Sequence, residues 1–247
     1  MIKEQNIQKY AIVTGGTKGI GKKTVQELLK RKYFVYTNFS SDIVSAEKSR
    51  KDFLEISPYF EVLQADQSDI AKFNEFVTYC KSKIPSLDCI ICNAGMTIRK
   101  QIDQISNTEW EAVLNVIVNS HFYLIRDCFD IIPDNSRIIF VGSLLGIYPH
   151  TLSLPYGVGK AALHSLALNL VKLFEGTNTT VNVIAPGFVE TEWQATKPEE
   201  IRNNIISKTA IKRFASVDEI SDAVMFCINN AFINGSIMEI NGGYSFK

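Results

Sequence analysis

A tyrosine and a lysine are spaced so that they could move a proton. Tyr156 and Lys160 are four residues apart in a segment with helical periodicity, so both side chains should lie on one face of a helix. A phenol with an ordinary pKa near 10 gives up its proton poorly at neutral pH, whereas a lysine cation about 4 Å away would stabilise the phenolate by roughly 4 kcal/mol at an effective dielectric of about 20. The spacing favours a general acid–base pair, although it is also common on helices for structural reasons alone.

A glycine-rich turn joins the first apolar segment to an expected helix. It reads Thr14-Gly15-Gly16-Thr17-Lys18-Gly19-Ile20-Gly21. Its glycines permit a tight turn, close approach of the backbone to a pyrophosphate and close helix–strand packing, and the first amides of the helix are free to bind phosphate. The turn therefore predicts a dinucleotide site, with ordinary turn chemistry as the alternative.

A regular alternation of strands and helices must position these residues. Short apolar, β-branched runs alternate with longer segments of 3.6-residue period. The expected strands are 10–14, 33–38, 60–65, 87–92, 137–142, 180–185 and 237–240. The expected helices are 20–31, 42–56, 69–83, 106–129, 155–174, 198–207 and 216–228. Strands that are apolar on both faces predict a seven-stranded parallel sheet with helices on both faces. This is a doubly wound (Rossmann) α/β fold in one domain over 1–247, which binds ligands at the carboxyl ends of its strands.

The composition excludes several classes of partner. Lys+Arg and Asp+Glu balance at 26 each, so no field of one sign attracts nucleic acid or an anionic membrane. No apolar run approaches the roughly 20 residues of a membrane span, and the polar segment 1–9 has no signal-peptide core. The odd count of five cysteines fits a reducing compartment, so we expect a cytoplasmic protein.

No metal site is expected. Cys89 and Cys92 form a CxxC pair, but they lie in an expected buried strand, whereas a zinc or redox site needs a loop or a helix end. The three histidines, His121, His150 and His164, are scattered along the chain.

Five motifs, in order, resemble those of the short-chain dehydrogenase/reductase family. They are TGGTKGIG at 14–21, NAG at 93–95, Ser143 with YGVGK at 156–160, PGFVET at 186–191 and NGG at 241–243. The match covers nearly the whole chain and implies an oxidoreductase that interconverts a carbonyl and an alcohol by hydride transfer with a nicotinamide cofactor. It implies that Ser143 donates to the substrate oxygen and that Tyr156 is the general acid/base. Lys160, the third implied catalytic residue, would also bond the nicotinamide ribose.

The resemblance also implies a set of residues around the cofactor. They are Gly15, Thr17, Lys18, Gly19, Ile20, Gly21, Phe39, Ser40, Ser41, Asp66, Gln67, Asn93, Ala94, Gly95, Tyr156, Lys160, Pro186, Gly187, Val189 and Thr191. Asp66 resembles the aspartate that contacts adenine in the family. Its alternative role is an ordinary N-cap for the helix expected from Ile70.

The kind of nicotinamide cofactor follows from charge. Relatives that prefer NAD usually carry an acidic residue just after the second strand, at the place of Phe39, so no carboxylate is expected there to repel a phosphate. Lys18, Ser40 and Ser41 could instead bind a 2′-phosphate, which carries a charge of about −1.5 to −2. We therefore expect NADP(H) rather than NAD(H).

One position departs from the family pattern. Many relatives have an asparagine that holds a water linking the lysine to solvent, and Ile117 takes this place when it is counted from Trp110. Asn115 and Asn119 lie two residues away and point elsewhere on a helix. One interpretation is an active enzyme in which Lys160 finds another acceptor, either a backbone carbonyl or a water held by Asn93 or Asn115, and in which Ile117→Asn raises turnover. The other is a catalytically weak or inactive cofactor-binding regulatory protein.

The segment 191–215 should form a short lid over the substrate, with Trp193 and the expected helix 198–207. Substrate contacts are expected from Ser143, Leu145, Tyr156 and Trp193, in a pocket completed by Leu144, Leu152 and Leu154. His150 could also touch the substrate, but a surface position is expected for it.

The layout from Tyr156 onward resembles that of 3-oxoacyl-(acyl-carrier-protein) reductases, which dock an acidic carrier protein on arginines. The corresponding places here hold the acidic run 127–134 and Thr177. Since acid repels acid, a small ketone, sugar or polyol is as expected as an acyl thioester. The resemblance also implies a homotetramer or homodimer, built through the helices at 106–129 and 155–174.

Overall fold

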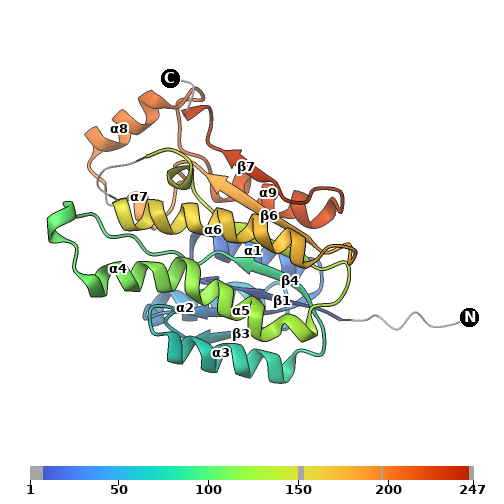
Figure 1. Cartoon of the computed structure of the whole chain (residues 1–247). Helices are drawn as coiled ribbons and strands as arrows, with labels where there is room; N and C mark the ends of the chain where they lie inside the picture. Colours follow the sequence, from blue (N-terminus) through green and yellow to red (C-terminus); the bar gives the residue numbers. More distant parts are fainter. Residues whose placement is uncertain (1–7, 150–152, 196, 245–247) are drawn as a thin grey trace, which may run out of the picture.

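Seven parallel strands form one sheet. The computed structural model describes residues 8–149, 153–195 and 197–244. The strands are β1 (Lys9–Val13), β2 (Tyr33–Phe39), β3 (Phe60–Gln64), β4 (Leu87–Cys92), β5 (Arg137–Val141), β6 (Thr180–Pro186) and β7 (Ile237–Ile240). Their order is β3-β2-β1-β4-β5-β6-β7, and every neighbouring pair is parallel (Figure 1). The predicted doubly wound Rossmann fold is confirmed. Its strand order reverses between β1 and β4, the point at which such sheets bind ligands.

Helices cover both faces of the sheet (Figure 1). They are α1 (Gly19–Lys30), α2 (Ile43–Leu54), α3 (Ile70–Lys83), α4 (Asn107–Leu114), α5 (Ser120–Cys128), α6 (Leu154–Leu173), α7 (Glu192–Ala195), α8 (Glu199–Lys208) and α9 (Val217–Asn229). Ile12 and Ile90 pack in the core layer with α3, α5 and α6, whereas Val13 and Ile91 pack in the layer with α1 and α9. Both faces of the central strands are therefore apolar, which explains their continuous apolar sequence.

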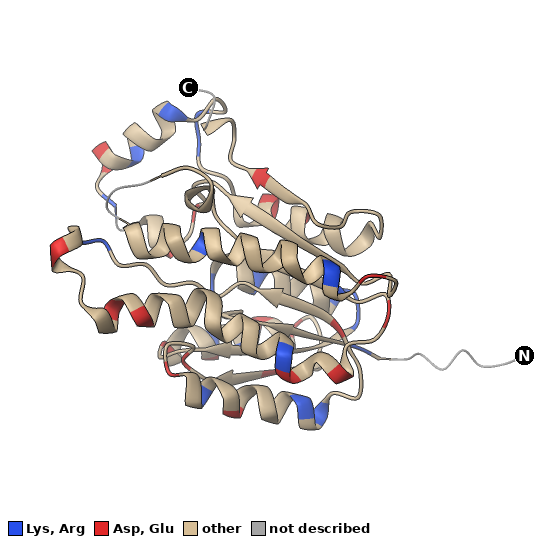
Figure 2. Cartoon of the chain, viewed as in Figure 1, with Lys and Arg blue, Asp and Glu red and all other residues tan. Residues whose placement is uncertain are grey.

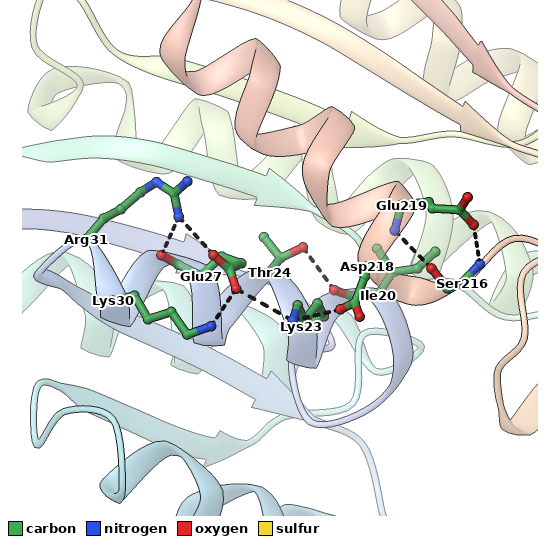
Figure 3. Close-up of polar contacts among 9 residues, drawn as sticks. All are labelled: Ile20, Lys23, Thr24, Glu27, Lys30, Arg31, Ser216, Asp218 and Glu219. Atoms are coloured by element: carbon green, nitrogen blue, oxygen red, sulfur yellow. Dashed lines mark hydrogen bonds and ion pairs between the residues drawn. The ribbon is translucent and has the colours of Figure 1, made fainter.

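Polar contacts join α1 to α9 and hold the helix that follows the glycine turn. Lys23 of α1 pairs with Asp218 in the first turn of α9 at 2.7 Å (Figure 3). Ser216 and Glu219 form a capping box that fixes the start of α9. The acidic first turn of α9 also suits the positive end of its helix dipole.

The prediction of one continuous helix over 106–129 is wrong. A π-helical turn at Asn115–Asn119 separates α4 from α5, and the Ser120 amide donates to the Asn115 carbonyl five residues back. A turn of this kind disturbs the regular hydrogen-bond ladder, so carbonyls near it need other donors. The Ile117 carbonyl accepts from Nδ1 of His121 at 2.9 Å. An apolar pattern of helical period does not show such an inserted residue.

The loops after β1, β4, β5 and β6 lie at one edge of the sheet, as parallel strands require (Figure 1). The helices α7 and α8 occupy most of the segment 191–215, and its action as a lid stays a prediction.

Within the described ranges, no helix is long and apolar enough to cross a membrane. The oligomer also stays a prediction. Phe122 of α5 and Leu168 of α6 are exposed large apolar side chains on the helices that would form it.

Candidate active site

A cavity of about 930 Å³ opens at the carboxyl edge of the sheet and gathers the predicted catalytic residues Ser143, Tyr156 and Lys160. The other predicted cofactor residues that line it are Gly15, Thr17, Lys18, Gly19, Ile20, Phe39, Ser40, Asp66, Gln67, Asn93, Ala94, Gly95, Pro186, Gly187, Val189 and Thr191. Trp193, a predicted substrate residue, lines it as well. Its volume is at the upper end of the range for small-molecule and cofactor sites.

Three predicted site residues lie outside the lining of this cavity. Gly21 faces Asn93 instead, and a Cβ at Gly21 would collide with the Asn93 side-chain amide, so this glycine serves packing. Ser41 is exposed in the turn that leads to α2. The Leu145 amide donates to Ser143 Oγ at 3.1 Å, but Leu145 itself does not reach the cavity.

The glycine turn is tied to the segment that follows β4. Gly15 has a φ of +64°, a backbone conformation that favours glycine. Thr14 Oγ1 accepts from the amides of Asn93 at 2.9 Å and Ala94 at 3.0 Å. Lys18 is the N-cap residue of α1 and provides no side-chain cap, so the first amides of α1 are available to an anion.

The three predicted catalytic residues come from two elements. Ser143 follows β5 and is 8% exposed, while Tyr156 and Lys160 lie one turn apart on α6. The buried Lys160 ammonium lies 5.7 Å from the centroid of the Tyr156 ring and donates to the Val141 carbonyl at 2.5 Å. Lys160 therefore has a backbone acceptor, as expected for a chain that lacks the asparagine of the family.

Burial dominates the electrostatics of this pair. It raises the pKa of Tyr156 above its ordinary value, against the opposing effects of a hydrogen bond with Ser143 and of the Arg99 charge. It also lowers the pKa of Lys160 to about 7. Burial thus acts against the expected lowering of the Tyr156 pKa by Lys160, which stays a prediction.

A buried histidine that the sequence analysis did not single out supports Ser143. His164 lies one turn after Lys160 on α6, and its Nε2 accepts from the Ser143 amide at 3.3 Å. A Cβ at Gly142 would collide with the ring. Burial and the Lys160 charge lower the pKa of His164 to about 4, so the ring is neutral near pH 7 and can accept. The sequence could have indicated this role, because His164 lies four residues after Lys160 and therefore on the same face of the helix.

A second buried histidine links the π-helical turn to the glycine turn. Nδ1 of His121 donates to the Ile117 carbonyl, so its Nε2 is the acceptor for the Thr14 hydroxyl at 2.9 Å. Burial lowers the pKa of His121 to about 3, which keeps the ring neutral. Gln67, a predicted cofactor residue, donates to Ser120 Oγ at 2.7 Å in the same network. The network fixes the backbone beneath the cavity.

The packing of Ile117 changes the expected effect of Ile117→Asn. The side chain is fully buried and lies against α6, where a Cβ at Gly159 would be 3.3 Å from Ile117 Cδ1. Asparagine would place an amide in this apolar layer, so we expect a loss of about 1–3 kcal/mol in the free energy of unfolding rather than a gain in turnover. Denaturant unfolding followed by circular dichroism measures it. Ile117→Val keeps the site apolar and should lose only about 1 kcal/mol. Unchanged stability of the asparagine variant would show that the site accommodates the amide.

A carboxylate that the sequence interpretation did not consider lines the cavity beside Lys18. Asp42 lines the cavity, forms an ion pair with Lys18 and caps α2 by accepting from the Ser45 amide at 2.9 Å. The Lys18 ammonium and the Ser45 amide lower the pKa of Asp42 to about 2, so it is ionised at neutral pH. The acid is absent at Phe39, but the turn after β2 brings another acid to the same region three residues later.

Two smaller interpretations are also corrected. Asp66 accepts from the Ser68 amide at 2.9 Å, and the N-cap of α3 is Asp69, so the alternative role of Asp66 as that N-cap is wrong. Its contact with adenine stays a prediction. Among the described residues of the predicted leucine pocket, Leu144 and Leu154 do not line the cavity. Leu152 and His150 lie outside the described residues.

The Trp193 ring meets Tyr156 nearly edge to face with centroids 6.3 Å apart. Residues that line the cavity beyond the predicted set include Met96, Thr97, Arg99, Glu192 and Gln194. The cysteines take no part. Cys89 and Cys92 are buried in β4, and burial raises the pKa of both thiols. In the part of the chain that the structure describes, no group of histidine, cysteine and carboxylate side chains could hold a metal ion.

Comparison with known proteins places the chain in a family. The family model described as short chain dehydrogenase matches residues 9–202. The acetoacetyl-CoA reductase of Allochromatium vinosum is 30% identical over 95% of this chain and 98% of its own length. The 3-oxoacyl-(acyl-carrier-protein) reductase FabG of Escherichia coli is 26% identical over 95% of this chain and 96% of its own. A short-chain dehydrogenase/reductase from Serratia marcescens has a TM-score of 0.89 at 26% identity, covering 96% of this chain and 98% of that one.

The chain therefore belongs to the short-chain dehydrogenase family, and the resemblance carried by its five motifs is confirmed. It is an oxidoreductase that acts on CH–OH and carbonyl groups.

Proposed function

We propose that this protein is an NADP(H)-dependent oxidoreductase that interconverts a carbonyl and an alcohol, with Tyr156 as the general acid/base. The observation that carries the proposal is the convergence of Ser143, Tyr156 and Lys160 on one cavity that the first turn of α1 also lines. Ser143 would donate a hydrogen bond to the substrate oxygen, and Tyr156 would exchange a proton with it. His164 would hold the Ser143 backbone in place.

The residues present fit a nicotinamide dinucleotide. The start of α1 would bind the pyrophosphate, and Lys18 with Ser40 would bind the 2′-phosphate. Gln194 lines the cavity and is 9% exposed, and its Oε1 has no hydrogen-bond partner within the described residues. A buried acceptor of this kind needs a donor, such as the carboxamide of nicotinamide. The nicotinamide supplies or accepts the hydride when bound, whereas the chain's own residues orient the substrate and hold the proton on Tyr156.

NADPH should bind at least about tenfold more tightly than NADH, a difference of about 1.4 kcal/mol. Asp42 competes with a phosphate for Lys18. Asp42→Asn removes that charge and keeps an N-cap for α2. The ratio of the dissociation constants for NADH and NADPH should therefore rise several-fold. Lys18→Gln should lower the same ratio, because it removes the cation that would bind the phosphate. Fluorescence titration of each protein with both cofactors gives the ratio of dissociation constants.

The matched control for this experiment is Asp69→Asn. Asp69 also caps a helix and pairs with a lysine, Lys72, but it lies outside the cavity lining. The ratio of the dissociation constants of Asp69→Asn for NADH and NADPH should equal the wild-type ratio. Equal affinities in the wild type, or a preference for NADH, would contradict the NADP(H) assignment. An unchanged ratio in both Asp42→Asn and Lys18→Gln would show that this ion pair does not meet the phosphate.

A 3-oxoacyl-thioester reductase is the second candidate, supported by two relatives named for thioester substrates. Asp127 and Asp130, at the end of α5 and just beyond it, pair with Arg126 and Lys81, which weakens the charge argument against docking of an acidic carrier protein. The alternative of an inactive cofactor-binding protein depended on Ile117. The hydrogen bond from Lys160 to the Val141 carbonyl argues against this alternative, because it gives the lysine an acceptor in a chain that lacks the asparagine of the family.

A further inference from the structure

Two cations, Arg99 in the cavity wall and Lys197 outside the cavity lining, have no carboxylate partner among the described residues. Arg99, in the loop after β4, lines the cavity and makes no hydrogen bond or ion pair with any described residue. Lys197, between α7 and α8, has its ammonium 5.1 Å from the centroid of the Phe188 ring, with no carboxylate of the described chain in ion-pair contact. The neighbouring Arg202, by contrast, pairs with Glu190 at 2.7 Å.

The two cations act on each other and on the reacting end of the cavity. Partial burial and the charges of Arg99 and Arg202 lower the pKa of Lys197 to about 8. The Arg99 charge also acts to lower the pKa of Tyr156. In Figure 2, blue segments in the loop after β4 and in the chain before α8 lie at the same end of the molecule. Cations that repel one another and have no counter-ion form a region of positive potential that an anion would stabilise.

Aromatic rings lie beside the reacting end of the cavity and beside Lys197. The Trp193 ring meets Tyr156 nearly edge to face, and its Cη2 would be 3.6 Å from a Cβ at Gly95 on the opposite wall. The Lys197 ammonium lies 5.1 Å from the centroid of the Phe188 ring, which does not line the cavity. Trp193 therefore gives the cavity an aromatic wall beside Tyr156.

We propose that the substrate is a small carbonyl compound, or the matching alcohol, that carries a carboxylate or a phosphate. Its anionic group would bind Arg99 and Lys197 while its carbonyl lies at Ser143 and Tyr156. This substrate class rests on the proposed function. Carboxylate and phosphate share the chemistry that an arginine and a lysine recognise, a negative charge spread over two or more acceptor oxygens. A neutral polyol would leave both cations unpaired.

Matched probes that differ in charge test this directly. One pair is 4-oxopentanoate and its methyl ester, and the other is dihydroxyacetone phosphate and dihydroxyacetone. The first pair tests a carboxylate, and the second tests a phosphate. Calorimetry gives the dissociation constants on the protein saturated with NADP⁺ and on the protein alone, so binding is measured without turnover. At least one charged probe should bind about tenfold or more tightly than its neutral partner, because hydrogen bonds between charged groups are the strong ones.

In the pair whose charged probe binds the wild type more tightly, the double variant Arg99→Gln, Lys197→Gln should bind the charged and the neutral probe with nearly equal affinity. The affinity of this variant for NADPH should equal that of the wild type. Lys208→Gln, at an exposed lysine in the last turn of α8, is the control and should keep the preference. The proposal is overturned if the wild type does not distinguish either pair, or if the preference survives in the double variant. It is also overturned if the double variant loses affinity for NADPH, because the cations would then serve the cofactor.

Failure of the proposed function would look different. No probe would then be reduced by NADPH, while the charge preference in binding would persist in the wild type and disappear in the double variant.

Discussion

Tyr156→Phe should lower kcat by ~10²–10⁴, the range for loss of a general acid or base, and leave the affinity for NADPH nearly unchanged. The substitution removes only the hydroxyl that exchanges a proton with the substrate oxygen. The ring remains, so its packing against Trp193 is preserved. Ser143 can still hold the substrate oxygen, but an alkoxide formed there would have no adjacent proton donor.

Steady-state consumption of NADPH with a panel of carbonyl compounds measures the rate, and fluorescence titration measures the affinity. Tyr148→Phe is the matched control, because Tyr148 is 37% exposed and does not line the cavity. Near-normal turnover in Tyr156→Phe would exclude this residue as the proton donor. Loss of NADPH binding together with the rate would indicate a disrupted site instead.

Lys160→Met should weaken NADPH binding by about ten- to hundredfold and lower kcat as well, because a hydrogen bond from a charged group contributes roughly 1.5–3 kcal/mol. Methionine keeps the length and the apolar stem of the side chain, so the buried position on α6 stays filled. The Val141 carbonyl loses the donor that it has at 2.5 Å. A variant that binds NADPH like the wild type would show that the ammonium does not contact the cofactor.

The same lysine predicts a pH dependence of cofactor binding. The pKa of Lys160 is about 7, lowered by burial, and a cofactor that accepts a hydrogen bond from the ammonium would raise it. Below pH 7 the proton is already present, so affinity does not depend on this group. Above pH 7 binding requires uptake of a proton, and affinity should fall by about tenfold per pH unit until the raised pKa is reached.

Titrations between about pH 6 and 9 test this linkage. Lys160→Met should abolish the slope above pH 7. Lys172→Met, at an exposed lysine in the last turn of the same helix, should keep it. A wild-type affinity that stays constant above pH 7 would contradict protonation of Lys160 as a condition for binding.

Features with local signals could be predicted from the sequence. The ends of the seven strands were placed to within one residue. The central strands are buried on both faces and read as short apolar runs bounded by polar residues, whereas β3 and β7 are only partly buried. The glycine turn and the pair Tyr156–Lys160 also depend on neighbours close in sequence. Their meeting in one cavity follows from the parallel topology, which brings the carboxyl ends of all strands to one edge.

Features that depend on contacts between distant segments could not be predicted. The ion pair of Lys18 with Asp42 joins the turns after β1 and β2, and nothing near either residue indicates it. The role of His121 beside the π-helical turn depends on Thr14, whose hydroxyl bonds Nε2 of the ring although it lies 107 residues earlier in the chain. The pKa values of Tyr156 and Lys160 depend on the depth of burial, and a distance inferred from helical spacing does not give that depth.

The most direct measurement of the central claim follows the hydride itself. The wild type and Tyr156→Phe are incubated with NADPH deuterated at the transferable C4 position and with a panel of neutral and anionic carbonyl compounds. Mass spectrometry then detects the alcohols formed. We predict deuterium on the carbinol carbon of at least one alcohol with the wild type, and about a hundredfold or more slower labelling with Tyr156→Phe. Tight NADPH binding without deuterium in any alcohol would contradict the claim and favour a cofactor-binding protein that does not catalyse reduction.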